Sequence, residues 1–159
     1  MPIEILDFIS HLSRERYRAA IIHTSPEMGP SMTQFCQKLC QQTGSKYLDL
    51  LEYFIQSPEL SEKIDRFSPE KLRGLLIEQS RGESLLILDR PDFLLDTWRN
   101  SERKDFYRLI TDQWDGYKDS MKAKLIVALQ TSVEIADLKI LDAKDQSRVF
   151  RLIDFNDIA

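Results

Sequence analysis

Two kinds of hydrophobic pattern alternate along this chain. Short stretches in which nearly every residue is apolar are separated by longer stretches in which apolar residues recur every three or four positions. The first kind is typical of strands buried on both faces, and the second kind is typical of helices with one buried face. The pattern predicts strands at residues 18–23, 46–50, 84–89, 124–132 and 148–155, the last of which alternates apolar and polar residues.

The segments between these strands predict helices whose ends carry sequence signals. They cover residues 3–17, 31–43, two segments between 57 and about 81, and 101–121. The two middle helices are predicted to begin at the pairs Ser57-Pro58 and Ser68-Pro69. A serine side chain can accept a hydrogen bond from an amide of the first turn, and proline, which has no N–H, loses no helical hydrogen bond there. Pro30 suits the first turn of helix 31–43, and Gly44 suits the position that closes it. The chain has only five glycines, so each is expected to meet a specific backbone need.

The alternation of strands and helices favours a parallel sheet. A helical crossover returns the chain to the end of the sheet where the previous strand began, so the next strand runs in the same direction. We therefore predict an α/β fold, a three-layer α/β/α sandwich around a mainly parallel five-stranded sheet. A single domain is expected over residues 1–159, with an N-terminal helix at 1–17 and an α/β core at 18–155. Ligands of such sheets bind outside the carboxyl ends of the strands. Those ends carry HTSPEMGPS, DRPD and QTS, which are expected to converge.

Two segments rich in aromatic residues allow two interpretations each. The charged segment 101–121 has the spacing of an amphipathic helix packed on the sheet, and it also suits a partner surface. The segment just after residue 89 holds either core residues or an exposed patch used for assembly. The residues concerned are Phe106, Tyr107, Ile110 and Trp114 in the first segment and Phe93, Leu94, Leu95 and Trp98 in the second.

Composition and charge narrow the class of protein. The 159 residues carry a net charge of −4 at pH 7, so bulk charge gives no attraction to nucleic acid or anionic membranes. A nucleic-acid contact inside a larger complex stays open. The N-terminus has no signal-peptide pattern, and no window approaches the about 20 apolar residues of a membrane span. Cys36 and Cys40 lie four residues apart in a helical pattern, which fits two reduced, packed thiols, and neither histidine has a cluster of metal ligands around it. We therefore expect a cytoplasmic protein without membrane contact.

The loop after the first strand has the layout of a phosphate-binding loop. A P-loop has the form G-x-x-x-x-G-K-[ST] after a strand, and its amides surround phosphate oxygens at a helix N-terminus. On this frame Thr24 takes the first glycine, Gly29 the second and Ser31 the final hydroxyl. Pro30 stands where the lysine belongs, so the cation is missing. A plain strand-to-helix turn with proline in the first helical turn explains the same residues.

Two later strand ends add to this pattern. The segment LLILD, ending at Asp89, resembles a Walker B strand, whose aspartate binds magnesium through water. The segment IVALQTS resembles the strand that ends in a polar sensor residue in P-loop ATPases of the AAA type. In order and spacing, residues 18–155 resemble an AAA-type core without its helical lid. YLDLLEYF and LLILDRPDFLLD are also similar to the BrxF family of BREX phage-defence systems, short P-loop proteins encoded beside a larger ATPase and a methyltransferase.

The resemblance implies a degenerate nucleotide site. Its residues are Thr24, Ser25, Gly29, Pro30, Ser31, Asp89, Arg90, Gln130 and Thr131. Ser31 and Asp89 are implied magnesium ligands only if a magnesium nucleotide binds, so ATP and Mg²⁺ are conditional cofactors. AAA-type enzymes usually carry glutamate after the Walker B aspartate to orient water, whereas this chain carries Arg90. The two losses predict a protein without catalytic residues that does not hydrolyse nucleotide.

Three functional hypotheses follow from these residues. The first is a degenerate P-loop domain, non-hydrolysing or weakly nucleotide-binding, that acts as a regulatory or assembly subunit beside a related ATPase or a second copy of itself. The second is a functional NTPase with a non-standard site, in which Arg90 supplies the missing positive charge. The third is a receiver-like phosphoacceptor domain with Asp89 as acceptor, although the first strand lacks the acidic pair that receivers carry.

Overall fold

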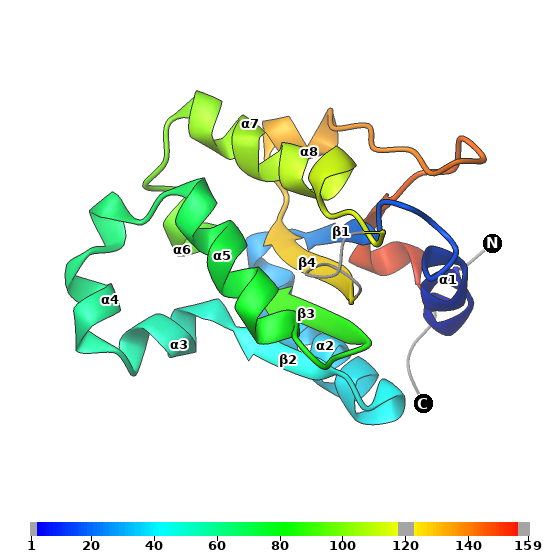
Figure 1. Ribbon diagram of the computed structural model, residues 1–159, viewed down its shortest axis with the longest axis horizontal. Coiled ribbons are helices and arrows are strands. Elements are labelled where there is room, and N and C mark those ends of the chain that lie inside the picture. The colour runs from blue at the N-terminus through cyan, green and yellow to red at the C-terminus, as the bar shows by residue number, and fades with distance from the viewer. Residues whose placement is uncertain (1–2, 118–122, 156–159) are drawn as a thin grey trace.

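Five parallel strands form one sheet in the computed structural model, which describes residues 3–117 and 123–155 (Figure 1). The strands are β1 (Ala19–Thr24), β2 (Lys46–Asp49), β3 (Leu85–Asp89), β4 (Lys124–Gln130) and β5 (Val149–Arg151). Their order across the sheet is β2-β3-β4-β1-β5, and every neighbouring pair is parallel. Each predicted strand segment overlaps one of these strands, so the α/β class and the parallel sheet are confirmed.

Helices cover both faces of the sheet, which gives the expected three layers (Figure 1). Helices α1 (Ile5–Leu12) and α2 (Gly29–Thr43) pack on one face, where they meet residues such as Leu85 and Ile87. The other face, with Leu86 and Leu88, is covered by α3 (Leu50–Ile55), α5 (Pro69–Ser80), α6 (Asp92–Leu95) and α7 (Asn100–Arg108). Because alternate residues of β3 enter opposite cores, the strand must be apolar at nearly every position.

The predicted helix ends are confirmed where a side chain defines them. The Ser57 hydroxyl accepts from the Leu60 amide at the start of α4 (Pro58–Glu62), and Ser68 accepts from Lys71 at the start of α5. A 3-10 turn, η2 (Ile64–Arg66), joins these two helices. Gly44 closes α2 with a φ of 65°, a conformation that favours glycine.

Several predicted boundaries were wrong. The first helix covers Ile5–Leu12 instead of 3–17, because the chain then crosses to the sheet and pairs Tyr17 with Asp115. The helix predicted at 101–121 is α7 followed by a π-helix, η3 (Leu109–Gln113); residues 118–121 lie outside the described residues. The last strand has three residues, since the chain turns into η5 (Leu152–Asp154) at the sheet edge. The short helices α3, α6 and α8 (Val133–Ala136) were not predicted.

The two ambiguous aromatic segments belong largely to the core. Leu94, Leu95 and Trp98 are buried, and so are Phe106 and the other apolar residues named for the 101–121 segment. The Trp98 indole donates to the Phe67 carbonyl oxygen at 2.7 Å. These segments therefore pack on the face of the sheet that carries Leu86 and Leu88. Across residues 3–117 and 123–155, no helix is long and apolar enough to cross a membrane.

One buried cation ties together segments that are distant in sequence. Arg148, which is 2% exposed, donates to the carbonyl oxygens of residues 17, 19, 110, 111 and 141 at distances of 2.7–3.2 Å. Burial lowers the pKa of its guanidinium, although Glu15 and Asp142 partly oppose this. Arg148 thus fixes the π-helical turn and the residues before β5 against the start of β1.

Candidate functional site

The strand ends predicted to converge do lie along one edge of the sheet. Strands β3, β4 and β1 are neighbours and run in the same direction, so Asp89, Gln130 and Thr24 all stand at their carboxyl ends. Thr24 pairs with Gln130 in the register of β1 and β4, and the Thr131 amide donates to the Thr24 carbonyl oxygen at 2.8 Å. The geometry therefore brings the three predicted segments to one side of the molecule.

The loop itself is a short 3-10 helix, η1 (Pro26–Met28), between Ser25 and the start of α2. The Met28 amide donates to the Ser25 carbonyl oxygen at 3.0 Å, and the Gly29 amide donates to the Pro26 carbonyl oxygen. These two donors are used within the loop and do not form an open cradle for phosphate oxygens. Pro30 stands in the first turn of α2, as predicted.

Gly29 has no special backbone role in this conformation. Its φ of −53° and ψ of −47° are helical, and a Cβ atom placed on it meets nothing within 4 Å. The expectation that each glycine meets a specific backbone need was wrong here, because the residue is simply the first of helix α2. A loop that holds phosphate needs glycines for left-handed turns or for close approach of the ligand, and neither applies to Gly29.

The carboxylate of Asp89 is enclosed by donors from three parts of the chain. Its Oδ2 accepts from the Thr33 hydroxyl at 2.8 Å and from the Tyr47 hydroxyl at 2.6 Å, and its Oδ1 accepts from the Arg90 amide at 2.9 Å. Asp89 is 3% exposed. Burial and the bond to this carboxylate raise the pKa of the Tyr47 phenol. Ser31, the predicted partner of Asp89 in metal binding, is exposed on α2.

Thr33 and Tyr47 were not predicted from the sequence. Thr33 lies only two residues beyond Ser31, and a count along the P-loop pattern alone does not reveal which hydroxyl reaches the acid. Tyr47 lies on β2, beyond β3 in the sheet, and its proximity to Asp89 depends on the parallel register in which Tyr47 pairs with Ile87. A tyrosine in a short apolar strand gives no other signal of this role.

Arg90 directs its charge away from the loop. Its side chain forms an ion pair with Asp49, with Nε 3.0 Å from Oδ1 and 2.9 Å from Oδ2. Asp49 ends β2, which lies on the opposite side of β3 from β4 and β1. The Asp49 carboxylate raises the pKa of Arg90, and a left-handed φ of 56° at Arg90 accompanies this arrangement. The guanidinium is therefore committed to Asp49.

The end of β4 borders a cavity with several charged side chains. The cavity has a volume of about 340 Å³, and Gln130, Thr131, Asp92, Asp96, Arg103 and Glu134 are among its lining residues. Asp92 Oδ1 accepts from the Gln130 amide at 2.8 Å, and burial raises the pKa of this carboxyl. Arg103 is paired with Glu134, with Nε 3.0 Å from Oε1. Three carboxylates facing one paired guanidinium make this cavity unsuitable for a phosphate group.

Thr131 also contacts a buried histidine that was not among the predicted site residues. The Thr131 hydroxyl and His23 Nδ1 share a hydrogen bond of 2.8 Å, and His23 is 7% exposed. Burial lowers the pKa of His23, and the charge of Arg151 on neighbouring β5 adds to that effect. His23 therefore acts as a polar link between β1 and the end of β4.

No protein-family model matches the chain, and no curated protein matches it. The site must therefore be interpreted from its own geometry.

That geometry does not fit a magnesium nucleotide. The two loop amides of Met28 and Gly29 are already bonded, and Asp89 already accepts two hydrogen bonds on Oδ2 and one on Oδ1. Among residues 3–117 and 123–155, no group of three or more His, Cys, Asp or Glu side chains is arranged to hold a metal ion. The side chains present therefore do not form a ready site for Mg-ATP.

The strand order argues against the receiver-like hypothesis. Receiver domains have the flavodoxin-like order 2-1-3-4-5, in which β1 lies between β2 and β3. Here β1 lies between β4 and β5, and β2 is next to β3. Asp89 in addition already accepts three hydrogen bonds from protein donors, two on Oδ2 and one on Oδ1.

Proposed function

We propose that this protein is a P-loop-like domain whose nucleotide site is closed by its own side chains, and that it acts as a non-hydrolysing assembly subunit. The observation that carries this proposal is the enclosure of Asp89 by Thr33, Tyr47 and the Arg90 amide. The place of this acid in the sheet also supports the proposal. Asp89 ends β3, and one strand, β4, lies between β3 and β1, the strand before the loop. An AAA-type P-loop protein keeps its magnesium-binding aspartate at such a strand end.

The bond between Thr33 and Asp89 supports a P-loop origin and changes the register of the motif. In P-loop proteins the loop hydroxyl and the strand-end aspartate both hold the same magnesium ion. If Thr33 is that hydroxyl, Met32 takes the lysine position, Ser31 the second glycine and Pro26 the first. Met32 is 3% exposed and packs in the core between α2 and the sheet. An apolar, buried side chain thus replaces the ammonium group.

The pairing of the cations near the carboxyl ends of the strands supports the absence of hydrolysis. Phosphoryl transfer depends on positioning and neutralising the charge of the phosphates. The nearby cations Arg90, Arg103 and Arg151 are each paired with a carboxylate of the chain itself. The functional NTPase hypothesis, in which Arg90 replaces the lysine, needs the Arg90–Asp49 pair to break first.

The assembly role is supported by apolar side chains exposed at the same edge. Met28, Val133 and Ile153 are 38%, 80% and 70% exposed, and they follow β1, β4 and β5, three neighbouring strands. A protein partner that covers this edge removes these side chains from water. A related AAA-type ATPase or a second copy is the partner that the resemblance to AAA-type and BrxF proteins suggests, and a role in BREX phage defence remains part of this proposal.

Thermal unfolding with and without Mg-ATP tests the closed site. We expect the same melting temperature in both conditions for the wild type and for Asp89→Asn, together with no measurable ATP turnover. A rise in melting temperature that Asp89→Asn abolishes contradicts the proposal, because it shows that nucleotide reaches the acid. Measurable turnover supports the functional NTPase instead.

A further inference from the structure

A cavity of about 440 Å³ lies between α1 and the loop that leads into β5. Residues 3–15 form one wall of this cavity, and residues 142–150 form the other. A volume of this order is typical of sites for small organic molecules, in which an apolar wall buries the ligand and a few polar groups orient it. The character of the two walls therefore indicates which class of molecule the cavity suits.

The inside of this cavity is apolar. Phe8 of α1 and Phe150 of β5 both line it, and their rings meet edge to face with centroids 4.6 Å apart. Ile3 and Phe8 are half-buried, so part of each side chain is in contact with water. A ligand that covers this apolar surface removes it from water, which is favourable. The cavity therefore favours a ligand with an apolar body.

The rim of the cavity carries a surplus of negative charge. Three negative charges remain when four carboxylates are set against one guanidinium and His11 is neutral (4 − 1). The carboxylates belong to Glu4, Asp7, Glu15 and Asp142, and the guanidinium belongs to Arg148. Arg148 is not placed to bind an anion, because Nε, Nη1 and Nη2 each donate to carbonyl oxygens of the chain itself. Within residues 3–117 and 123–155, none of the four carboxylates forms an ion pair.

Two of these carboxylates are held in place by the main chain. Asp142 Oδ1 accepts from the amides of Lys144 and Gln146 at 2.8 and 2.9 Å. Glu15 Oε2 accepts from the Ala143 amide at 3.3 Å. The second oxygen of each carboxylate has no hydrogen-bond partner among the described residues. Two acceptors in fixed positions therefore remain at the rim for a donor that the ligand brings.

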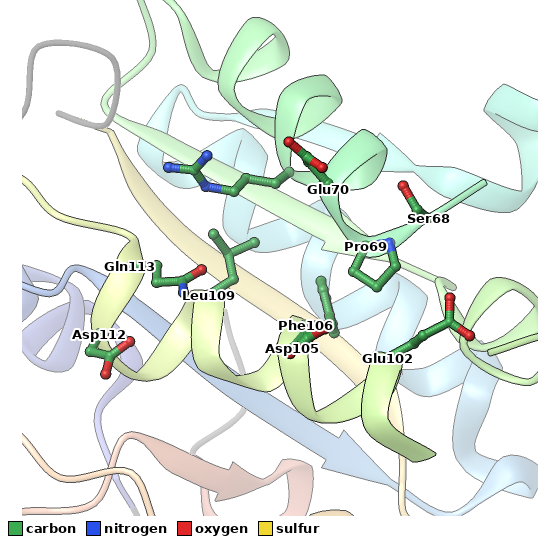
Figure 2. A pocket seen from close by; sticks show the side chains of 10 residues that line it. Ser68, Pro69, Glu70, Glu102, Asp105, Phe106, Leu109, Asp112 and Gln113 are labelled. Atoms are coloured by element: carbon green, nitrogen blue, oxygen red, sulfur yellow. The ribbon is translucent and has the colours of Figure 1, made fainter. Parts of the chain in front are cut away.

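A larger hollow, of about 650 Å³ between α5 and α7, provides a comparison within the same molecule (Figure 2). Figure 2 shows Glu70 on one wall and Glu102 and Asp105 on the other, so this hollow is acidic as well. Its two large apolar side chains, Phe106 and Leu109, are 1% and 2% exposed, so a ligand would contact little of either. The hollow in Figure 2 thus combines acidic charge with little accessible apolar surface, and it supplies a control.

We propose that the cavity between α1 and β5 binds a small amphiphilic cation, an organic amine with an apolar body. The apolar body lies against Ile3 and Phe8, and the ammonium group pairs with the carboxylates of the rim. An anionic amphiphile such as a fatty acid meets the surplus of negative charge. A metal ion finds no group of three suitable side chains among the described residues. This inference is independent of the closed nucleotide site, since Glu15 and Asp142 precede β1 and β5, whereas that site lies at the carboxyl ends of the strands.

Equilibrium dialysis with 1-naphthylmethylammonium tests the proposal, because naphthalene fluorescence reports the bound fraction. At about 0.15 M salt, exposed charges more than about 8 Å from the probe are largely screened. We expect saturable binding of this amine and none of 1-naphthylacetate, which carries the opposite charge. Excess methylammonium, which has no apolar body, is expected to leave the amine bound. The absence of saturable binding, equal binding of 1-naphthylacetate, or displacement by methylammonium overturns the proposal.

Two matched variants, with folding verified by circular dichroism, locate the site. Glu4→Gln/Asp7→Asn removes two exposed charges from the rim, and Glu70→Gln/Asp105→Asn removes two exposed charges of the same types from the hollow in Figure 2. We expect the first variant to bind the amine roughly fivefold more weakly than wild type, from the loss of two exposed charge contacts. The second is expected to bind like wild type. Equal affinity in the two variants contradicts the site, because it shows no binding at the rim or attraction to net charge alone.

Glu15→Gln tests one of the positioned carboxylates without removing its hydrogen bond. The side-chain oxygen of glutamine still accepts from the Ala143 amide, so the charge is lost and the contact is kept. The affinity for the amine is expected to fall roughly threefold, from the loss of one charge contact. Unchanged affinity in this variant shows that the ammonium group does not pair with this rim.

Discussion

Removing the side-chain donors around Asp89 measures how firmly the site is closed. Tyr47→Phe and Thr33→Val each delete one hydrogen bond to the buried carboxylate and keep nearly the same shape. A hydrogen bond to a charged group contributes about 1.5–3 kcal/mol, so each variant is expected to lose about that much free energy of unfolding. The double variant leaves only the Arg90 amide and is expected to lose about 3–6 kcal/mol, a large part of the 5–15 kcal/mol typical of domains.

Urea unfolding followed by circular dichroism provides the assay, with the slope of free energy against urea checked for each variant. Tyr53→Phe is the matched control, because Tyr53 is a half-buried tyrosine of α3 without a hydrogen bond among the described residues, and we expect a change within about 0.5 kcal/mol. Ser31→Ala is expected to be equally silent, since Ser31 is exposed. If Tyr47→Phe is as stable as Tyr53→Phe, Asp89 is not held by the contacts described above.

Three further predictions concern buried polar groups. Arg148→Met is expected to lose at least about 4 kcal/mol of unfolding free energy or to fail to fold, because five carbonyl oxygens lose their donor; a loss below about 1 kcal/mol in urea unfolding contradicts this. Burial raises the pKa of Tyr107 to about 12, so the folded state keeps its proton longer than the unfolded state. Stability should therefore fall between pH 10 and 12, by up to about 1.4 kcal/mol per pH unit, and less steeply in Tyr107→Phe. Burial raises the pKa of Cys36 and brings that of Cys40 to about 11, so neither thiol should react with a disulfide reagent at pH 8 until urea unfolds the chain.

The strands and their convergence were predictable because they depend on local chemistry. Runs such as residues 84–89 are apolar at nearly every position, and only a sheet buried on both faces accommodates them. Serine before proline predicted two helix starts, since the side chain and the ring each satisfy the first turn by themselves. Parallel connection then required the polar strand ends to meet at one edge.

The contacts inside the site were not predictable, because they depend on tertiary register. Whether Ser31 or Thr33 reaches Asp89 is decided by where α2 begins, and the helix starts at Gly29 instead of residue 31. The pairing of Arg90 with Asp49 depends on β2 lying beside β3. The buried Arg148 gave no signal either, since its acceptors are carbonyl oxygens from three separate segments.

Short elements were missed for a related reason. Helices α6 and α8 have four residues each, too few for a hydrophobic period to appear. Their starts are fixed by contacts such as Ser132 accepting from the Ile135 amide at 3.2 Å. The edge strand β5 ends after three residues because the chain turns there into η5.

A calorimetric titration of Mg-ATP into the wild type and into two rebuilt loops tests the central claim most directly. Pro26→Gly/Ser31→Gly/Met32→Lys restores the P-loop pattern in the register that ends at Thr33, and Thr24→Gly/Pro30→Lys restores it in the register that ends at Ser31. Both rebuilt loops also carry Tyr47→Phe, which removes the donor from β2 that closes Asp89 Oδ2. With folding of each variant verified by circular dichroism, we predict saturable heat for the Thr33 register alone. Saturable binding by the wild type, or by the Ser31 register in place of the Thr33 register, contradicts a P-loop closed through Thr33 and Asp89.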